Sequence, residues 1–460
     1  MDRIIKTASR VSGRMTLLGD KSISHRAAIL GALVNGDTTI VNYSPSQEFE
    51  ATLRCLTQYG VEIEYAQDEK NKLIIHGKGL EGLTQPKQPL DAGNSSATVR
   101  LLMGLAAACP FESIFEGSEK LKARPMLRII EPMEKMGATV ESDNYRVPLK
   151  VLGGNLHGIK YIMPLSTSQV KGAVLTAGLY AEGNTELVER IPCRDHFERL
   201  MAFMGIKFKK EKIQPEVPKA DDEFERRLRK LNNKSAIIEA RGGMFTLMGG
   251  QRPAAGKILT VPGDVSAAAL FVAAGVLVKN SDLVIDDVCL NPTRIGFLDI
   301  LEKMRANITF EAGSKKGFEP AGRIQAKYGP LKGRRIVGET IPSIIDELPI
   351  MAVIATQAQG TTVIRDAFEL RHKETDRIKT VVSNLRKMGA RIGELEDGMA
   401  IDGGTELEGA EITTFGDHRI AMAFAIAGLI AKGETVIKDA ECVATSHPTF
   451  WGDLDSIVEY

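Results

Sequence analysis

The chain has 460 residues, about three times the most common domain size, so we expect at least two domains. Hydrophobic residues make up 43% of the sequence and charged residues 26%, which is typical of a globular protein with substantial cores. Lysine plus arginine and aspartate plus glutamate both number 59, and aromatic residues are only 5%. A globally basic nucleic-acid-binding protein is therefore disfavoured.

The sequence shows no targeting or membrane segment. Its first residues lack the basic, apolar and small-residue order of a signal peptide, and its longest apolar runs, such as 267–278, are shorter than the roughly 18 residues that span a bilayer. The five cysteines are scattered and the seven histidines lie far apart. We expect a cytoplasmic protein with reduced thiols, no metal site and no membrane partner.

An internal repeat is the most informative pattern in the chain. A small-residue helix pattern runs through a short turn into a β-branched strand, at intervals of about 75 residues. The six copies cover residues 32–40, 106–114, 179–187, 276–285, 355–364 and 430–437. A second signature, a helix end of the type Leu-x-x-Met-Gly-Ala before a strand, recurs at 56–63, 133–140, 200–208, 301–308 and 385–392. The repeats predict two α/β domains of three units each.

The third interval between repeats is longer than the others and requires an insertion. Residues 207–234 are strongly charged and interrupted by prolines, with a helical pattern over 223–231. We expect this insertion to be a solvated surface excursion.

Polar segments precede several of the apolar helix patterns. Residues 19–26 precede a helix predicted over 27–33, which Ser22 or Ser24 can cap. Residues 92–100 precede a helix over 101–108. A basic loop, 120–126, precedes a helix with Pro125 in its first turn.

The same arrangement continues further along the chain. Residues 165–169 precede a helix over 170–180, and residues 416–419 precede a helix over 420–430. Glu374 and Arg377 are spaced to share one face of a helix, and Asp346-Glu347 interrupts apolar sequence, where an unpaired charge is costly.

Each segment alone also fits a capped helix with solvated cations. If the repeats gather these helix starts around one cleft, dipoles and side chains together would bind phosphate or carboxylate groups.

Six of these segments, in their order along the chain, resemble the signature motifs of the 5-enolpyruvylshikimate-3-phosphate (EPSP) synthase family. The matching residues are Asp20-Lys21-Ser22 with Arg26, Gly93-Asn94 with Arg100, Ser168-Gln169, Asp346-Glu347, Lys373-Glu374-Thr375-Asp376-Arg377 and Asp417-His418-Arg419.

The resemblance implies a two-domain inside-out α/β barrel of six βαβαββ units, three per domain. By analogy, residues 20–261, with the insertion 207–234, would form the domain that binds shikimate 3-phosphate. Residues 1–19 and 262–460 would form the domain with the catalytic carboxylates. The active-site cleft would lie between them, with hinge segments near 18–20 and 261–263.

The implied reaction transfers the enolpyruvyl group of phosphoenolpyruvate to the 5-hydroxyl of shikimate 3-phosphate, without a metal or organic cofactor. Asp346 would take the hydroxyl proton, while Glu374 and Lys21 would handle protons at the methylene. The residues implied for shikimate 3-phosphate are Lys21, Ser22, Arg26, Thr167, Ser168, Gln169, Arg194, Asp346 and Lys373. Those implied for phosphoenolpyruvate are Lys21, Ser96, Arg124, Gln169, Arg377 and Arg419.

The chain departs from the common pattern of the family at three places. Many members have Gly-Asn-Ala-Gly-Thr where this chain has Gly93-Asn94-Ser95-Ser96-Ala97. Ser96 therefore adds a side chain beside the implied phosphoenolpyruvate site, and we expect a glyphosate-tolerant enzyme similar to class II. Residues 445–448 replace a lysine-bearing C-terminal motif, and Arg194-Asp195-His196 stands where the common class has a tyrosine.

Three other functions compete with this one. UDP-N-acetylglucosamine enolpyruvyl transferases share the implied fold, but they usually carry a cysteine in the loop that matches 118–125, where this chain has none. A non-catalytic α/β repeat protein would gain nothing from Asp346-Glu347 or from convergent cations. A role similar to RNA-terminal phosphate cyclase would need a nucleophilic histidine and an RNA partner. We expect a monomer that binds only small molecules.

Overall fold

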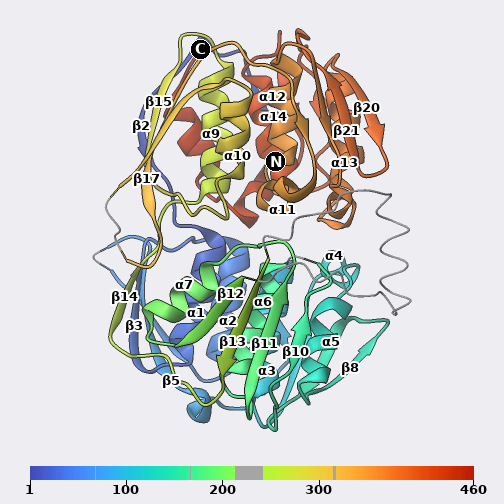
Figure 1. Cartoon of the computed structure of the whole chain (residues 1–460). Helices are drawn as coiled ribbons and strands as arrows, with labels where there is room; N and C mark the ends of the chain where they lie inside the picture. Colours follow the sequence, from blue (N-terminus) through green and yellow to red (C-terminus); the bar gives the residue numbers. More distant parts are fainter. Residues whose placement is uncertain (68, 166, 213–241, 314–316) are drawn as a thin grey trace.

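The computed structural model describes residues 1–67, 69–165, 167–212, 242–313 and 317–460. Their buried apolar side chains form two separate cores (Figure 1). One core runs from Ile23 to Val261 and also takes in Cys289 and Phe318. The other combines Ile5–Leu17 with Val265–Ile457. We call the two parts the first and second domains, and Figure 1 shows the first below the second.

Three helices occupy the centre of each domain. In the first domain these are α1 (Lys21–Ala32), α3 (Ser96–Ala108) and α6 (Ser168–Gly178). In the second they are α9 (Val265–Leu277), α12 (Leu348–Gln357) and α14 (His418–Gly428). Small residues let these helices approach closely: a Cβ atom on Gly104 of α3 would lie 2.2 Å from the Ala173 carbonyl oxygen of α6.

More peripheral helices lie around these central ones. They are α2 (Gln47–Gln58), α4 (Glu119–Lys122), α5 (Leu127–Lys135), α7 (His196–Phe203), α10 (Gly296–Lys303), α11 (Ile341–Ile344), α13 (Arg377–Lys387) and α15 (Phe450–Asp455). Most of the longer ones pair one apolar face with one exposed face, as expected for helices that cover a core.

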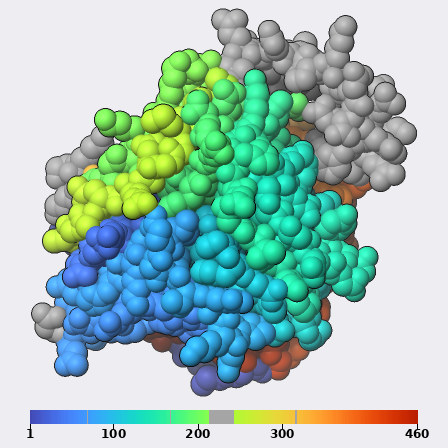
Figure 2. Space-filling model, turned by 90° about the horizontal axis from the view of Figure 1, so that it is seen from below, coloured from blue at the N-terminus to red at the C-terminus, as the bar shows by residue number. Residues whose placement is uncertain are grey.

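Three four-stranded sheets form the outer layer of the first domain, each with one parallel pair followed by antiparallel pairs. The first has the order β14 (Lys257–Thr260), β3 (Asn35–Val41), β5 (Lys72–Lys78) and β4 (Glu62–Tyr65). The second has β6 (Leu90–Asp91), β7 (Glu112–Glu116), β9 (Arg146–Leu152) and β8 (Thr139–Asp143). The third has β10 (Lys160–Ile162), β11 (Asn184–Glu189), β13 (Gly243–Met248) and β12 (Phe208–Lys212). Figure 2 shows successive segments of this domain, from blue through teal to yellow-green, side by side on its surface.

Three further sheets surround the second domain. One has the order β16 (Asn307–Ala312), β17 (Ala321–Lys327), β15 (Asp282–Cys289), β2 (Arg10–Thr16) and β24 (Val458–Glu459). Another has β18 (Arg335–Ile336), β19 (Thr361–Ile364), β21 (Gly398–Asp402) and β20 (Arg391–Leu395). The last has β1 (Arg3–Ile5), β23 (Thr435–Ile437) and β22 (Glu411–Ile412). Helices inside and sheets outside, three units to a domain, confirm the predicted inside-out α/β fold.

The repeated turns have the backbone conformation that their residues favour. Five of the six turn positions have positive φ, namely Gly36, Gly183, Asn280, Gly360 and Gly433. The second signature behaves in the same way at Gly60, Gly137, Gly205, Arg305 and Gly389. Glycine tolerates this region without steric cost, which explains why the repeats could be recognised from the sequence.

Two chain segments cross between the domains side by side. Gly19 and Gly263 form an antiparallel bridge, Asp20 N donates to the Pro262 carbonyl at 2.8 Å, and Asp264 N donates to the Leu18 carbonyl at 3.0 Å. These segments coincide with the hinge predicted near 18–20 and 261–263, which stays a prediction.

Several local predictions were wrong. Residues 208–212 of the expected surface excursion form β12, which pairs with β13, whereas 213–234 lie outside the described residues. Asp20, not Ser22 or Ser24, caps α1 by accepting from Ile23 N at 2.9 Å. Pro125 precedes α5 and is not in its first turn. No helix among the described residues is long and apolar enough to cross a membrane.

Candidate active site

Side chains from both domains meet where the central helices of the first domain begin. Arg194 of the first domain lies 2.6 Å from Asp346 of the second, and Arg124 of the first lies 3.4 Å from Glu374 of the second. The fold therefore brings together residues that are far apart in the sequence, at the junction of the two domains.

The first wall of the site is built on the N-terminal ends of α1 and α6. Arg26, one turn into α1, donates to the Ser22 carbonyl at 2.8 Å and to the Ser168 carbonyl and hydroxyl oxygens at 2.9 and 3.2 Å. Burial, followed by the nearby charge of Arg194, lowers the pKa of Arg26 to about 10. The two positive charges of Arg26 and Arg194 repel each other, and an anion bound beside them would offset this repulsion.

Gln169 and Thr167 stand at the start of α6. The Gln169 side-chain oxygen accepts from Arg100 at 3.0 Å, which orients the amide. Thr167 is the N-cap residue of α6 but makes no side-chain capping hydrogen bond. Its hydroxyl therefore does not serve to cap the helix.

Ser96 is the first residue of α3, and its hydroxyl contacts a predicted ligand-binding arginine. Ser95 caps this helix by accepting from Thr98 N at 3.1 Å, which leaves the Ser96 hydroxyl for other contacts. Arg124 donates to Ser96 Oγ at 3.1 Å. The added hydroxyl thus directly contacts the guanidinium expected to bind phosphoenolpyruvate.

Asp346 lies among cations of both domains. Besides Arg194, Arg377 lies 3.6 Å and Lys373 Nζ 3.8 Å from its carboxylate oxygens. Burial would raise the pKa of Asp346, but Arg194 and then Lys373 overcome it and hold this pKa well below its ordinary value. The carboxylate is therefore ionised in this arrangement.

Glu374 bridges cations of the two domains. It pairs with Arg377 as well as with Arg124, and Arg377 in turn binds Asp417 at 2.9 Å. Burial opposes ionisation of Glu374, yet Arg377 and Arg124 lower its pKa below the ordinary value. The expected shared helix face was wrong in one respect, because α13 begins only at Arg377 and Glu374 lies in the preceding segment.

Two predicted cations point to other partners. Lys21 forms an ion pair with Glu48 of α2, and the Arg419 guanidinium donates to the Ser266 carbonyl at 3.4 Å. Within the described ranges, neither side chain has a direct hydrogen bond or ion pair with another predicted site residue. Burial and then the charge of Lys21 hold the pKa of His418 well below its ordinary value, so Lys21 still acts electrostatically on the Asp417–Arg419 segment.

Sequence reasoning missed Glu48 and Arg294. Glu48 contacts Lys21 and lines a cavity of about 470 Å³ together with Asn94, Ser95 and Thr445. Arg294 is almost fully buried and donates to Ser266 Oγ at 2.8 Å, near the N-cap carboxylate Asp20 at 3.5 Å. Only the burial of these charged side chains marks them, and burial is not visible in the sequence.

The arrangement combines many cations with two ionised carboxylates that face them. Guanidinium groups suit phosphate and carboxylate oxygens because their donors form a planar fork. The carboxylates Asp346 and Glu374 supply groups that can accept and return protons. The site can therefore bind small anions and move protons beside them.

Comparison with known proteins agrees with these features. The sequence profile of EPSP synthase (3-phosphoshikimate 1-carboxyvinyltransferase) matches residues 5–218 and 222–454. A 3-phosphoshikimate 1-carboxyvinyltransferase of Bacillus cereus (strain B4264) is 43% identical over 451 residues, covering 98% of this chain and 97% of its own. One of Bacillus thuringiensis (strain Al Hakam) is 43% identical over 461 residues and covers both chains fully.

Comparison with solved structures leads to the same family. The structure of an EPSP synthase from Acinetobacter baumannii superposes with a TM-score of 0.82 at 34% identity, covering 99% of this chain and 98% of its own. The chain belongs to the EPSP synthase family.

Proposed function

We propose that this protein transfers the enolpyruvyl group of phosphoenolpyruvate to the 5-hydroxyl of shikimate 3-phosphate and releases phosphate. The observation that carries the proposal is the pairing of Asp346 and Glu374 with cations of both domains in a chain that matches the family over nearly its whole length. A scaffold without catalysis has no need for two ionised carboxylates at the junction of the two domains.

The two substrates occupy adjoining parts of the site in this proposal, with Lys21 and Gln169 shared between them. Shikimate 3-phosphate is bound by Lys21, Ser22, Arg26, Thr167, Ser168, Gln169, Arg194, Asp346 and Lys373. Phosphoenolpyruvate is bound by Lys21, Ser96, Arg124, Gln169, Arg377 and Arg419. The contact of Arg26 with Ser22 and Ser168 supports the first group, and the contact of Arg124 with Ser96 supports the second.

The chemistry requires proton transfers at the 5-hydroxyl of shikimate 3-phosphate and at the methylene carbon of phosphoenolpyruvate. The attacking 5-hydroxyl loses a proton to Asp346 while the methylene of phosphoenolpyruvate gains one through Glu374 and Lys21. Because Glu374 is ionised in this arrangement, it must first take up a proton, whereas the Lys21 ammonium already carries one. The resulting tetrahedral ketal carries a methyl group, and it expels phosphate as this methyl carbon returns a proton and becomes a methylene again. Arginine and lysine side chains compensate the charge that develops on the leaving phosphate.

The domain boundaries and the setting belong to the same proposal. Residues 20–261 form the shikimate 3-phosphate domain, and residues 1–19 with 262–460 form the domain that carries Asp346 and Glu374. Because one chain supplies both walls of the site, a monomer suffices for catalysis. The five cysteines are free thiols, which suits a reducing cytoplasm.

A phosphate-release assay tests the proposed reaction. Phosphate should appear when phosphoenolpyruvate is mixed with shikimate 3-phosphate and this protein, but not when UDP-N-acetylglucosamine replaces shikimate 3-phosphate. Turnover with the UDP-sugar alone would instead identify the related transferase, and no turnover with either acceptor would contradict the proposal.

Glyphosate tolerance is the second part of the proposal. Glyphosate is longer than phosphoenolpyruvate, and the Ser96 side chain stands where many members have bare backbone. Overpacking of about 1–3 kcal/mol would weaken glyphosate binding by roughly 5- to 150-fold. We therefore expect Ser96→Gly to lower the glyphosate inhibition constant by that factor, with a much smaller change in the KM for phosphoenolpyruvate.

Ser96→Ala is the matched control, because it keeps the Cβ atom but removes the hydroxyl that accepts from Arg124. If the steric effect dominates, Ser96→Ala should remain tolerant. Equal inhibition constants for the unaltered protein and Ser96→Gly would show that Ser96 does not cause tolerance.

A further inference from the structure

The start of α7 is held by side chains of the opposite domain. Asp195 is the N-cap residue of α7 but makes no side-chain capping hydrogen bond within its helix. Its carboxylate accepts instead from Asn291 of the second domain at 2.7 Å and from Arg199 at 2.8 Å. The orientation of this helix start therefore depends on a contact between domains.

Glu319 completes this contact. Its Oε1 accepts from His196 Nδ1 at 2.7 Å, and its Oε2 accepts from Asn291 at 2.8 Å. His196, Asn291 and Glu319 are all almost fully buried. Removing one member of such a network leaves buried polar groups without partners, which is costly.

An apolar contact lies beside the polar one. Phe318, next to Glu319, packs its ring 5.8 Å from that of Phe203 at the other end of α7, and it belongs to the core of the first domain. The Phe318-Glu319 segment of the second domain thus touches both ends of α7.

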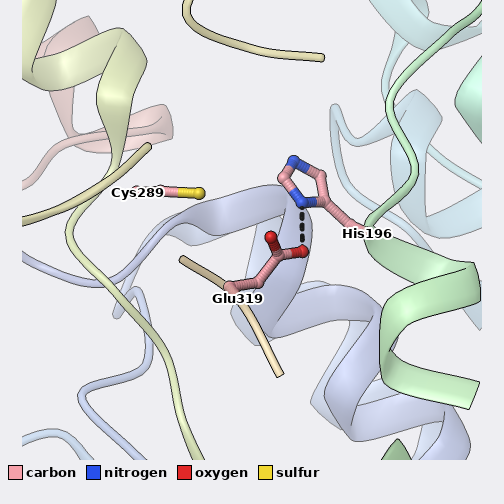
Figure 3. Close-up of side chains that lie close together, drawn as sticks. All are labelled: His196, Cys289 and Glu319. Atoms are coloured by element: carbon pink, nitrogen blue, oxygen red, sulfur yellow. Dashed lines mark hydrogen bonds and ion pairs between the residues drawn. The ribbon is translucent and has the colours of Figure 1, made fainter. Parts of the chain in front are cut away.

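The same cluster also includes Cys289 (Figure 3). Its sulfur, a His196 ring nitrogen and a Glu319 oxygen lie within 4.8 Å of one another, close enough to suggest a metal site. However, both Glu319 oxygens already accept hydrogen bonds, and burial raises the pKa of the Cys289 thiol well above its ordinary value. Because metals bind the thiolate, the cluster fits a hydrogen-bond network better than a metal centre.

We propose that Glu319 is a positioning residue for Arg194, acting through His196, Asn291 and Asp195. Arg194 immediately precedes the held helix start, and its guanidinium lies 2.6 Å from Asp346. Fixing Asp195 and His196 against the second domain limits where Arg194 can reach, and so holds it ready for the phosphate of the acceptor substrate. This inference rests on the proposed function, in which Arg194 binds shikimate 3-phosphate.

Substitution of Glu319 should affect one substrate selectively. In Glu319→Ala we expect the KM for shikimate 3-phosphate to rise about tenfold, while kcat and the KM for phosphoenolpyruvate change less than about threefold. Glu319→Gln should have a smaller effect. Its side-chain oxygen can still accept from His196, and only the hydrogen bond from Asn291 is lost, because two NH2 groups then face each other. Glu311→Ala, an exposed glutamate on β16, is the control and should leave all constants unchanged.

A double-mutant cycle separates positioning from a general loss of structure. If Glu319 acts through Arg194, adding Glu319→Ala to Arg194→Ala should raise the KM for shikimate 3-phosphate no further. Thermal unfolding and calorimetric binding of shikimate 3-phosphate should be measured for every variant, with Glu319→Gln used if Glu319→Ala does not fold. Additive effects, or equal changes in both KM values, would overturn the positioning role while leaving the proposed reaction intact. An unaltered protein that neither binds shikimate 3-phosphate nor releases phosphate would overturn both.

Discussion

Asp346→Asn should bind both substrates but lose turnover by roughly 10²- to 10⁴-fold, the usual contribution of a positioned general base. Asparagine has nearly the same shape as aspartate, and its side-chain oxygen can still accept from Arg194. It cannot take the proton of the attacking hydroxyl. The loss should therefore appear in kcat, measured by phosphate release, with KM values changed far less.

The lowered pKa of Asp346 bears directly on this role. A general base works best when its pKa lies near the working pH, and Arg194 and Lys373 hold this pKa well below that point. The negative charge of a phosphate group bound to Arg194 would partly cancel the positive charge that lowers the pKa of Asp346. The pKa of Asp346 would therefore rise. We therefore expect binding of shikimate 3-phosphate to bring the pKa of Asp346 closer to the working pH.

Glu347→Gln is the matched control for this variant. Glu347 is adjacent in the chain, is buried, and accepts a hydrogen bond from Ser266 and not from a predicted substrate-binding side chain. It should affect stability more than kcat. If Asp346→Asn keeps most of its turnover, another group must accept the hydroxyl proton.

The sequence predicted those features that depend on residues close together in the chain. Gly36, Gly183, Gly360 and Gly433 mark four of the six repeated turns, because glycine adopts positive φ at little cost. Lys373, Glu374 and Arg377 could be grouped because they are neighbours in the chain. Motif order then predicted that distant segments share one site.

Contacts between distant segments were not predictable in the same way. Glu48 meets Lys21 only because α2 packs beside α1, and Glu319 meets His196 only because the second domain covers α7. Nothing in the local sequence distinguishes these glutamates from exposed ones. Even the capping error at α1 has this origin, since Asp20, Ser22 and Ser24 are all good caps, and Asp20 is the one held by a backbone hydrogen bond to Pro262 of a distant segment.

Substitution of Glu374 is the second change with a large expected effect, and kinetics can distinguish this effect from a loss of substrate binding. Glu374→Gln should lower kcat roughly 10²- to 10³-fold, because the amide cannot carry a proton to or from the methylene. The carboxylate also pairs with Arg124 and Arg377, and so competes with an anionic substrate for them. Neutralising it should leave the KM for phosphoenolpyruvate unchanged or lower.

Arg124→Ala alters the other partner of the Arg124–Glu374 ion pair and should change the KM for phosphoenolpyruvate in the opposite direction. It removes a cation expected to bind phosphoenolpyruvate, and it should raise the KM for this substrate more than that for shikimate 3-phosphate. Steady-state kinetics with each substrate varied in turn distinguish the two variants. A raised KM for phosphoenolpyruvate in Glu374→Gln, with kcat preserved, would assign Glu374 to binding and leave Lys21 to deliver the proton. Equal effects of Arg124→Ala on both substrates would remove Arg124 from the phosphoenolpyruvate site.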